Sequence, residues 1–448
     1  LSGMVHEVRV YSRSLKPDEI QSNQQSKLRD LPKPILLAAG PYARFLDRET
    51  AEVVWRTVEP TASVLIVGTT GRSRKVTDKR LKTNHRLQID GLKRNRIYTY
   101  RITTGSSSVS PEFELDTTFN FTRMRAPDRP SPYADDVDSR IAAETAETLL
   151  AESGVTTGIC LVLGADDGRL VYELVRRSDL IVIGVETDEA KVAAARESLT
   201  RAGIYGQRAT IRQVESLDKL PYTGDFANLI VSDHLLREGK IACSSREVMR
   251  VLRPDGGLAL IGQTPNAADP IDRDTLLAWC ESIQFSVSEG PRGVWARITR
   301  GPLKGAGEWS HLYGRPNNSG FGGELLGGVR NARDLRVQWL GRPGPRAQPD
   351  RSGRKPSPLS TGGRLFVQGL HRLIGLDAYN GTILWSLEIP PLQRFNVPRD
   401  SGNWCADDDH VFVAINNACW RINAQTGEVQ SIDTVQPGAR KDWKYDWS

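Results

Sequence analysis

The chain has 448 residues, of which 39% are hydrophobic and 25% charged, so it has the composition of globular protein and enough length for about three domains. No stretch approaches the ~18 consecutive apolar residues that a membrane-spanning helix needs. The net charge is +6, but the basic runs Arg72–Arg96 and Arg330–Lys355 are not interleaved with aromatic residues as a base-stacking surface would be, so nucleic-acid binding is not expected.

The first segment, residues 1–24, is too short to fold alone. Glu7-Val-Arg-Val-Tyr11 alternates like a strand, and Arg13-Ser-Leu15 and Glu19-Ile20 follow it. This pattern resembles the last strand and exit helix of a concanavalin A-like (laminin G-like) jelly roll. Because the chain also starts without an initiator Met and ends inside a repeat, we expect it to be part of a longer polypeptide.

Residues 34–121 contain short apolar runs separated by turns, which predicts a β-sandwich. Expected strands include residues 51–56, 63–67, 86–89 and 97–102. The spacing from Leu87 to Tyr100 resembles fibronectin type III domains, and Gly40-Pro41-Tyr42 is similar to the N-terminal sandwich of purple acid phosphatases. That family's metal ligands lie in a separate domain that this chain lacks, so we expect a spacer or adhesion module.

Residues 135–300 alternate buried strands with amphipathic helices, after a Pro-rich linker over residues 123–138. Because strands buried on both faces read as continuous apolar runs, this alternation predicts a Rossmann-like, doubly wound domain with a mostly parallel sheet. The expected strands are 158–163, 180–185, 209–214, 225–231 and 258–261, followed by a hairpin of 285–287 with 294–299.

The order of these elements resembles class I S-adenosylmethionine-dependent methyltransferases, as does the run Val251-Leu-Arg-Pro-Asp-Gly-Gly-Leu258. A dehydrogenase is the competing interpretation. The turn from Gly164 to Gly168 is not G-x-G-x-x-G, and its two acids would repel a pyrophosphate at a helix N-terminus. S-adenosylmethionine carries a sulfonium cation instead, so the charge favours this cofactor over NAD.

The resemblance implies a set of cofactor-binding residues. Three would wrap the methionine and ribose, one would bind the ribose hydroxyls, two would face the adenine, and one would meet the methionine amino group or the substrate. In that order these residues are Gly164, Asp166 and Gly168, then Glu186, then Glu215 and Ser216, then Asp233. His234, beside Asp233 at the end of a strand, is the candidate general base.

Two departures from the family pattern leave a degenerate, non-binding scaffold as the alternative. Val162 stands where the family usually has an acid, and Asp166 replaces the middle glycine of the turn. Aspartate tolerates a left-handed backbone better than most residues, but its side chain occupies space beside the ligand.

Residues 305–448 carry a repeat with a 46-residue period. Leu365-Phe-Val367 recurs at Val411-Phe-Val413, and Trp339 recurs at Trp385. A period in the forties with strand-rich units predicts β-propeller blades. The Leu-Asp-Ala-x-x-Gly-x-x-x-Trp motif that ends at Trp385 resembles the repeat of pyrroloquinoline-quinone (PQQ) propellers. Because this segment holds only two to three blades, its ring cannot close, and PQQ binding is less expected than a protein-binding scaffold.

The five cysteines form no CxxC motif and the six histidines do not cluster, so no metal site is expected. Cys405 and Cys419 could pair in an oxidising compartment.

Together these patterns predict a multidomain chain with a β-sandwich, then a Rossmann-like α/β domain, then a partial β-propeller. Two functions remain open. One is a methyltransferase of unreadable substrate. The other is an exported or envelope interaction protein, or a quinoprotein, whose Rossmann domain is degenerate. The neighbouring modules favour export, whereas the supply of S-adenosylmethionine favours the cytoplasm.

Overall fold

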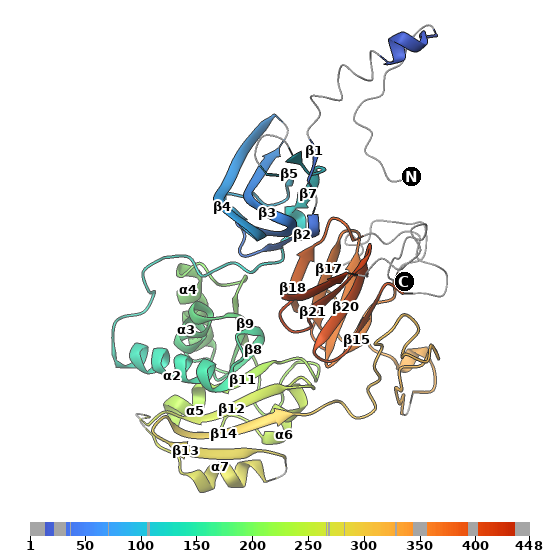
Figure 1. Ribbon diagram of the computed structural model, residues 1–448. Coiled ribbons are helices and arrows are strands. Elements are labelled where there is room, and N and C mark those ends of the chain that lie inside the picture. Colours follow the sequence, from blue (N-terminus) through green and yellow to red (C-terminus); the bar gives the residue numbers. More distant parts are fainter. Residues whose placement is uncertain are drawn as a thin grey trace.

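The computed structural model describes residues 14–21, 33–392 and 402–434, apart from residues 36, 70, 105–107, 266, 268, 282, 328 and 344–355. A β domain, an α/β domain and a pair of small sheets follow one another along the chain (Figure 1). The predicted jelly-roll strand lies outside the described residues, and residues 17–21 beyond it are helical. None of the described helices has the length and apolarity to cross a membrane.

The β domain is organised by one long hairpin. The strands expected at 51–56 and 63–67 are in fact a single strand, β3 (Ala51–Thr69), which pairs along most of its length with β4 (Arg72–Ile89). The pairing shifts register between Arg56 and Ser63. The remaining strands are β1 (Lys33–Pro34), β2 (Leu37–Phe45), β5 (Ile97–Thr103), β6 (Ser108–Val109) and β7 (Phe113–Asp116).

A buried histidine lies beside the register shift of this hairpin. His85 stacks on Trp55 with 4.9 Å between ring centroids and 5° between planes. Its two ring nitrogens lie 2.8 Å from the hydroxyls of Thr57 and Ser63, which flank the register shift. Because buried polar groups cost free energy unless they are paired, this trio explains why polar residues interrupt the apolar alternation of β3.

The α/β domain contains a seven-stranded sheet of order β10-β9-β8-β11-β12-β14-β13, in which β14 runs antiparallel to β12 and the strands before it are parallel. The predicted pairing of residues 159–163 with 181–185 is confirmed, with Ile159 opposite Ile181 and Leu163 opposite Val185. The strands are β8 (Thr157–Leu163), β9 (Asp179–Glu186), β10 (Ala209–Gln213), β11 (Leu229–Ser232), β12 (Gly257–Gln263), β13 (Ser286–Gly290) and β14 (Gly293–Arg300).

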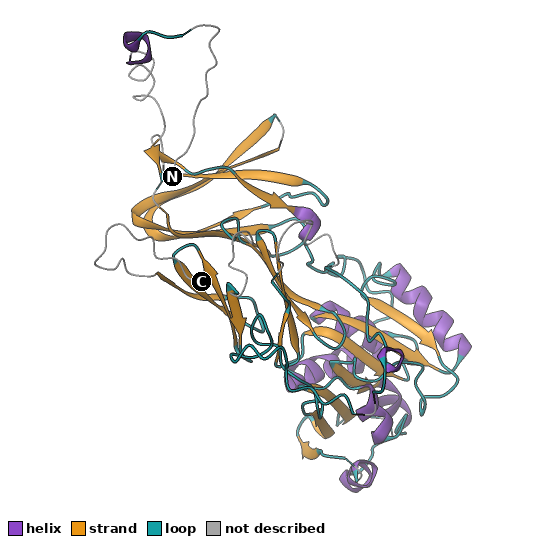
Figure 2. Cartoon of the chain, turned by 90° about the vertical axis from the view of Figure 1, so that its right-hand side faces the viewer, coloured by secondary structure: helices purple, strands orange, loops and turns teal. Residues whose placement is uncertain are grey.

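Helices pack on both faces of this sheet, so it is doubly wound (Figure 2). The strand order reverses between β8 and β11, and α/β proteins bind ligands at the carboxyl ends of strands at such a switch point. A short helix directly after β11, α5, had not been expected from the sequence. The helices are α2 (Val137–Ser153), α3 (Arg169–Arg177), α4 (Glu189–Arg201), α5 (Asp233–Glu238), α6 (Ser245–Val251) and α7 (Arg273–Cys280).

The 46-residue repeat folds as two four-stranded antiparallel sheets. The last three strands of each start 46 residues apart, whereas the described part of residues 305–358 holds no strand longer than an isolated bridge. The first sheet has β15 (Leu359–Thr361), β16 (Arg364–Gly369), β17 (Arg372–Asp377) and β18 (Ile383–Glu388). The second has β19 (Trp404–Ala406), β20 (His410–Ile415), β21 (Ala418–Asn423) and β22 (Val429–Thr434).

Trp339 and Trp385 occupy equivalent positions, as the repeat predicts. The indole nitrogen of Trp339 donates to the Ala378 carbonyl, and that of Trp385 donates to the Ala424 carbonyl, both at 2.9 Å. A glycine lies against each indole ring, Gly381 against Trp339 and Gly427 against Trp385. A Cβ at Gly427 would lie 2.6 Å from the Trp385 side chain. Each tryptophan therefore fixes its segment to the next sheet along the chain.

The first repeat sheet also joins the rest of the molecule. Its strand β18 pairs with β2, where Glu388 lies opposite Ala43, so one eleven-stranded sheet runs from the β domain into the repeat. On its other side, Asp377 accepts a hydrogen bond from the Asn228 amide at 2.9 Å and pairs with Arg253 at 3.2 Å. Asn228 precedes β11, so this contact lies at the amino-terminal edge of the parallel sheet.

Candidate functional site: a carboxylate-lined cleft

A cleft of about 320 Å³ opens at the carboxyl ends of β8, β9 and β11, next to the switch point of the sheet. Five of the eight residues predicted for the site line it, and three do not. Those that line it are Gly164, Asp166, Glu186, Asp233 and His234. Those that do not are Gly168, Glu215 and Ser216. The other lining residues are Asp138, Ile141, Ala142, Lys191, Leu236, Arg237 and Glu238.

The turn after β8 needs its glycines for contacts within the protein. Gly164 has φ of 64°, and a Cβ there would lie 2.4 Å from the Cβ of His234. The first glycine therefore lets α5 approach the turn. A Cβ on Gly168 would lie 3.1 Å from the Tyr133 hydroxyl, so this glycine packs beneath the segment before α2. Asp166, at φ of 45°, adopts the left-handed backbone that aspartate tolerates.

Glu186 is buried at the end of β9 and supports the same turn. One carboxylate oxygen accepts the Asp166 amide at 3.0 Å, and the other accepts the amides of Thr187 at 2.8 Å and Asp188 at 3.2 Å. The second oxygen also accepts the Thr187 hydroxyl at 3.4 Å and is fully used, whereas the first accepts only the Asp166 amide and keeps about one lone-pair position for a ligand. Glu186 is among the residues that line the cleft.

Glu215 and Ser216 lie in the loop after β10, away from the cleft lining. Glu215 is exposed, and the Ser216 hydroxyl accepts the Asp218 amide at 3.1 Å within the loop. The predicted adenine contacts therefore have no counterpart among the residues that line the cleft in this arrangement.

Arg237 is the main site residue that sequence reasoning missed. Its guanidinium lies 3.3 Å from carboxylate oxygens of both Asp233 and Asp166, and 3.5 Å from Asp167. Burial alone would lower the pKa of Arg237, but the surrounding carboxylates raise it overall. The only sequence signal was the four-residue spacing from Asp233, which becomes informative once α5 is known to be a helix.

Lys191 closes the cleft from the side of α4. Its ammonium lies 3.0 Å from Asp166 and 3.2 Å from Glu238. The hydrogen bond with Asp166 raises the pKa of Lys191, so the lysine stays charged. Burial would raise the pKa of Asp166, but Lys191 and Arg237 outweigh this effect and lower it.

Asp233 is the most deeply buried acid of the cleft, with 2% of its surface exposed. One oxygen faces Arg237 at 3.3 Å, whereas the other has no hydrogen-bond partner. Burial raises the pKa of Asp233 to about 7, despite the opposing effect of Arg237. Near neutral pH this group therefore passes between a neutral donor and a buried anion.

This raised pKa predicts a pH-dependent stability. In the unfolded chain Asp233 loses its proton near pH 4, whereas in the folded protein it keeps the proton up to about pH 7. Stability therefore falls as the pH rises from about 4 to about 7, by at most roughly 4 kcal/mol, and is level above that range. We expect Asp233→Asn to gain stability relative to the wild type across this window, measured by urea unfolding at pH 5 and pH 8.

Glu388, whose pKa burial also raises to about 7, titrates in the same window. It is present in both proteins, so its contribution cancels in the difference between them. A difference in unfolding free energy that stays constant from pH 5 to pH 8 would contradict the assignment to Asp233.

His234 lies on the wall of the cleft, with Nε2 3.6 Å from a Glu238 carboxylate oxygen. The lining holds five carboxylates against the two cations Lys191 and Arg237, so the cleft is negative even when Asp233 is protonated. Such a surface suits a cationic ligand and repels a phosphate. Within the described ranges, no group of three or more His, Cys, Asp or Glu residues is placed to hold a metal ion.

Neither a protein-family profile nor a curated protein matches the sequence. Solved structures match over about a third of the chain. A SAM-dependent methyltransferase from Aquifex aeolicus is 18% identical, covering 37% of this chain and 93% of that one, with a TM-score of 0.31. Magnesium protoporphyrin IX methyltransferase from Synechocystis, solved with bound SAM, is 17% identical. The match covers 36% of this chain and 79% of that one, with a TM-score of 0.27. The [4+2]-cyclase SpnF is 17% identical. The match covers 37% of this chain and 65% of that one, with a TM-score of 0.28.

Proposed function

We propose that the α/β domain binds S-adenosylmethionine in the carboxylate-lined cleft and transfers its methyl group to an acceptor. The observation that carries this proposal is the position and charge of the cleft. It lies at the switch point of a doubly wound sheet, and its wall is negative where a phosphate-bearing nucleotide would need positive charge. Its volume of about 320 Å³ is at the lower end of the usual range for small-molecule sites.

Two unused polar positions fit this cofactor. Glu186 retains about one lone-pair position for a ribose hydroxyl. The unpartnered oxygen of Asp233 suits the methionine ammonium group. When bound, S-adenosylmethionine supplies a methyl group activated by the positive sulfur.

The remaining chemistry belongs to the chain. The negative wall stabilises a cation in the cleft, and His234 accepts the proton that the methyl acceptor loses. The pair of His234 with Glu238 would then stabilise the imidazolium that forms. The cleft gives no feature from which to name the acceptor.

Calorimetric titration with S-adenosylhomocysteine tests the proposal. Glu186→Gln should weaken binding by about 1–3 kcal/mol, roughly 5- to 150-fold in Kd, because a hydrogen bond to a charged acceptor is lost. The matched control is Glu189→Gln, which removes the same charge from an exposed position in the first turn of α4. Far-UV circular dichroism checks that both variants fold. The absence of binding to the folded wild type would reject the proposal.

A specific observation favours a second candidate, a non-catalytic scaffold. Arg237 engages four carboxylates, and His234 covers the first glycine of the turn, so the protein's own side chains occupy positions next to the turn. In this case the domain would serve to hold the modules on either side of it. The same titration separates the two candidates, since a scaffold gives no heat with S-adenosylhomocysteine.

We further propose that the two repeat sheets are blades of a PQQ-type β-propeller that binds a protein partner. The 46-residue offset and the equivalent tryptophans support this assignment. For the β domain we propose a fibronectin type III-like spacer, and for the whole chain an exported or envelope location. Fractionation of the native host with an antibody against the chain would test the location.

A further inference from the structure

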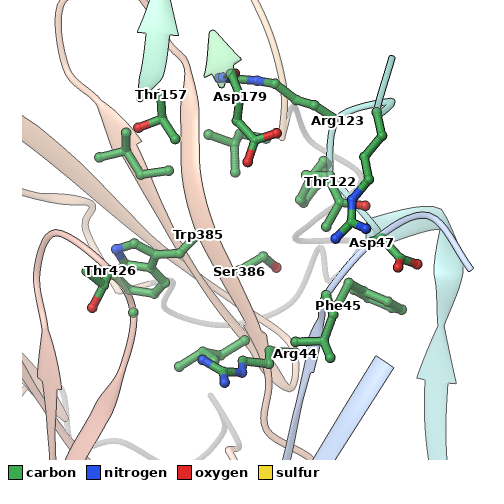
Figure 3. Close-up of a pocket in the computed structure, with 17 residues that line it drawn as sticks. Arg44, Phe45, Asp47, Thr122, Arg123, Thr157, Asp179, Trp385, Ser386 and Thr426 are labelled. Atoms are coloured by element: carbon green, nitrogen blue, oxygen red, sulfur yellow. Dashed lines mark hydrogen bonds between the residues drawn. The ribbon is translucent and has the colours of Figure 1, made fainter. Parts of the chain in front are cut away.

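A second cavity, of about 300 Å³, lies where the β domain, the α/β domain and the repeat sheets meet (Figure 3). Thr157 and Asp179, the first residues of β8 and β9, line one side of it. It therefore lies at the amino-terminal edge of the parallel sheet, opposite to the carboxylate-lined cleft. The other walls come from residues 44–47, residues 121–125, strand β18 and the turn before β22.

Part of the wall is apolar and aromatic. Phe45, Phe121 and Leu387 line it together with Trp385, the tryptophan that fixes the first repeat sheet to the second. Flat aromatic walls favour a ligand with a flat apolar body, because stacked and edge contacts between rings add to the burial of apolar surface.

The charged part of the wall has one more cation than anions. Three guanidinium groups line the cavity, those of Arg44, Arg123 and Arg125, against the two carboxylates of Asp47 and Asp179. In Figure 3 the Arg123 side chain extends from the connecting segment into the cavity. Arg44 is paired with Glu52 at 2.8 Å, whereas Arg123 donates to a neutral acceptor, the backbone carbonyl of Asp179.

Arg123 is a cation without enough negative charge around it. Burial and the neighbouring Arg208 lower its pKa to about 10, and the opposing effect of Asp179 is too small to restore it. An anion placed in the cavity would compensate this charge, and a guanidinium binds carboxylates and phosphates through two parallel hydrogen bonds.

A polar group on the opposite wall is also unsatisfied. The hydroxyl oxygen of Ser386 is buried and has no hydrogen-bond partner, although its residue lines the cavity. Buried hydroxyls are nearly always paired in folded proteins, so an orphan in a residue that lines a cavity points to a partner there.

We propose that this cavity binds a small molecule that carries an oxyanion, a carboxylate or a phosphate, on a flat apolar body. Arg123 and Ser386 bind the oxyanion, and Trp385 and the two phenylalanines contact the apolar body. Since the β domain, the α/β domain and the repeat sheets all contribute to the wall, the bound ligand holds these three parts together. This site is independent of the proposed methyl transfer, which uses the opposite edge of the sheet.

Calorimetry and thermal unfolding with benzoate and phenyl phosphate as probes test the site. We expect at least one of them to bind the full chain and to raise its Tm, and the better probe identifies the oxyanion. Ser386→Ala should weaken that probe roughly 3- to 10-fold and Arg123→Gln roughly 10-fold or more. Arg101→Gln is the control, because it removes the same charge from an exposed pair with Glu112 outside the cavity.

Ser386→Ala keeps the test valid if Arg123→Gln perturbs the fold. Its hydroxyl makes no bond in the free protein, so its removal should leave the Tm without ligand unchanged. The proposal is overturned if neither probe binds the wild type at up to about 10 mM, equivalent to a binding free energy weaker than about 3 kcal/mol. It is also overturned if Ser386→Ala and Arg123→Gln bind the probes as tightly as Arg101→Gln does.

Discussion

Replacing Trp385 with alanine is expected to destabilise the repeat region by about 3–5 kcal/mol, the range for truncating a large buried aromatic side chain. Trp385 is 7% exposed and packs in one core with residues of both repeat sheets. Its indole nitrogen also donates to the buried Ala424 carbonyl, which would lose its side-chain partner. The two sheets should then separate into units that cannot bury their own facing surfaces.

Urea unfolding followed by tryptophan fluorescence and by hydrogen exchange of β20 and β21 would measure this effect. The repeat supplies its own control, because Trp339 makes the same hydrogen bond from a more exposed position. Trp339→Ala should cost clearly less than Trp385→Ala. Equal losses for the two variants would show that the packing between the sheets does not depend on Trp385.

Replacing Arg208 with methionine is expected to destabilise the α/β domain by about 3–5 kcal/mol. The Arg208 side chain is 2% exposed, and its guanidinium donates to four backbone carbonyls. Three of these belong to the end of α3 and the start of β9, and the fourth belongs to Met124 in the segment before α2. Methionine fills similar space but donates no hydrogen bond to these carbonyls.

The comparison protein is Arg201→Met, which changes the same charge at an exposed position at the end of α4. Thermal unfolding of both variants, together with limited proteolysis near Met124, measures the difference. We expect earlier cleavage at residues 123–129 only for Arg208→Met. A variant as stable as the Arg201→Met protein would mean that solvent replaces Arg208 at all four carbonyls.

The parts of the fold that sequence predicted well are those with local periodicity. The buried strands from residue 158 to residue 185 stand out because both faces of each strand are covered, which leaves an uninterrupted apolar run. The repeat is equally legible, since a glycine such as Gly381 and a tryptophan such as Trp385 must recur wherever one sheet docks on the next. In both cases the residues of one short segment are enough to predict its structure.

The parts that sequence missed depend on contacts between distant segments. The long hairpin of β3 and β4 was expected as separate strands, because its polar interruption makes sense only beside the buried His85. In the cleft, Gly164 and Glu186 were found from their spacing along the strands. Arg237 was not, because Asp166 and Asp167 lie in another turn, and its four-residue spacing from Asp233 is informative only once α5 is known to be a helix.

The run from Val251 to Leu258 is a second case in which contacts between distant segments could not be predicted from the sequence. Arg253 lies in the run that resembles methyltransferases, yet its guanidinium pairs with Asp377 of the repeat. The sequence indicated a family resemblance at this position, whereas the structure gives the arginine a part in joining two bodies. Which neighbour a surface residue meets is decided by how the modules pack, and that information is spread over the whole chain.

The junction between β2 and β18 has a mechanical consequence. Among the described residues, one pair, Ala43 with Glu388, is in register across it, whereas β3 and β4 are in register along most of their length. Under tension between the β domain and the repeats, we therefore expect the pairing of β2 with β18 to break before the pairing of β3 with β4 does. The second cavity borders this junction, since Arg44 and Phe45 of β2 and Leu387 of β18 line it. A ligand bound there would therefore strengthen the junction and raise the force needed to separate β2 from β18.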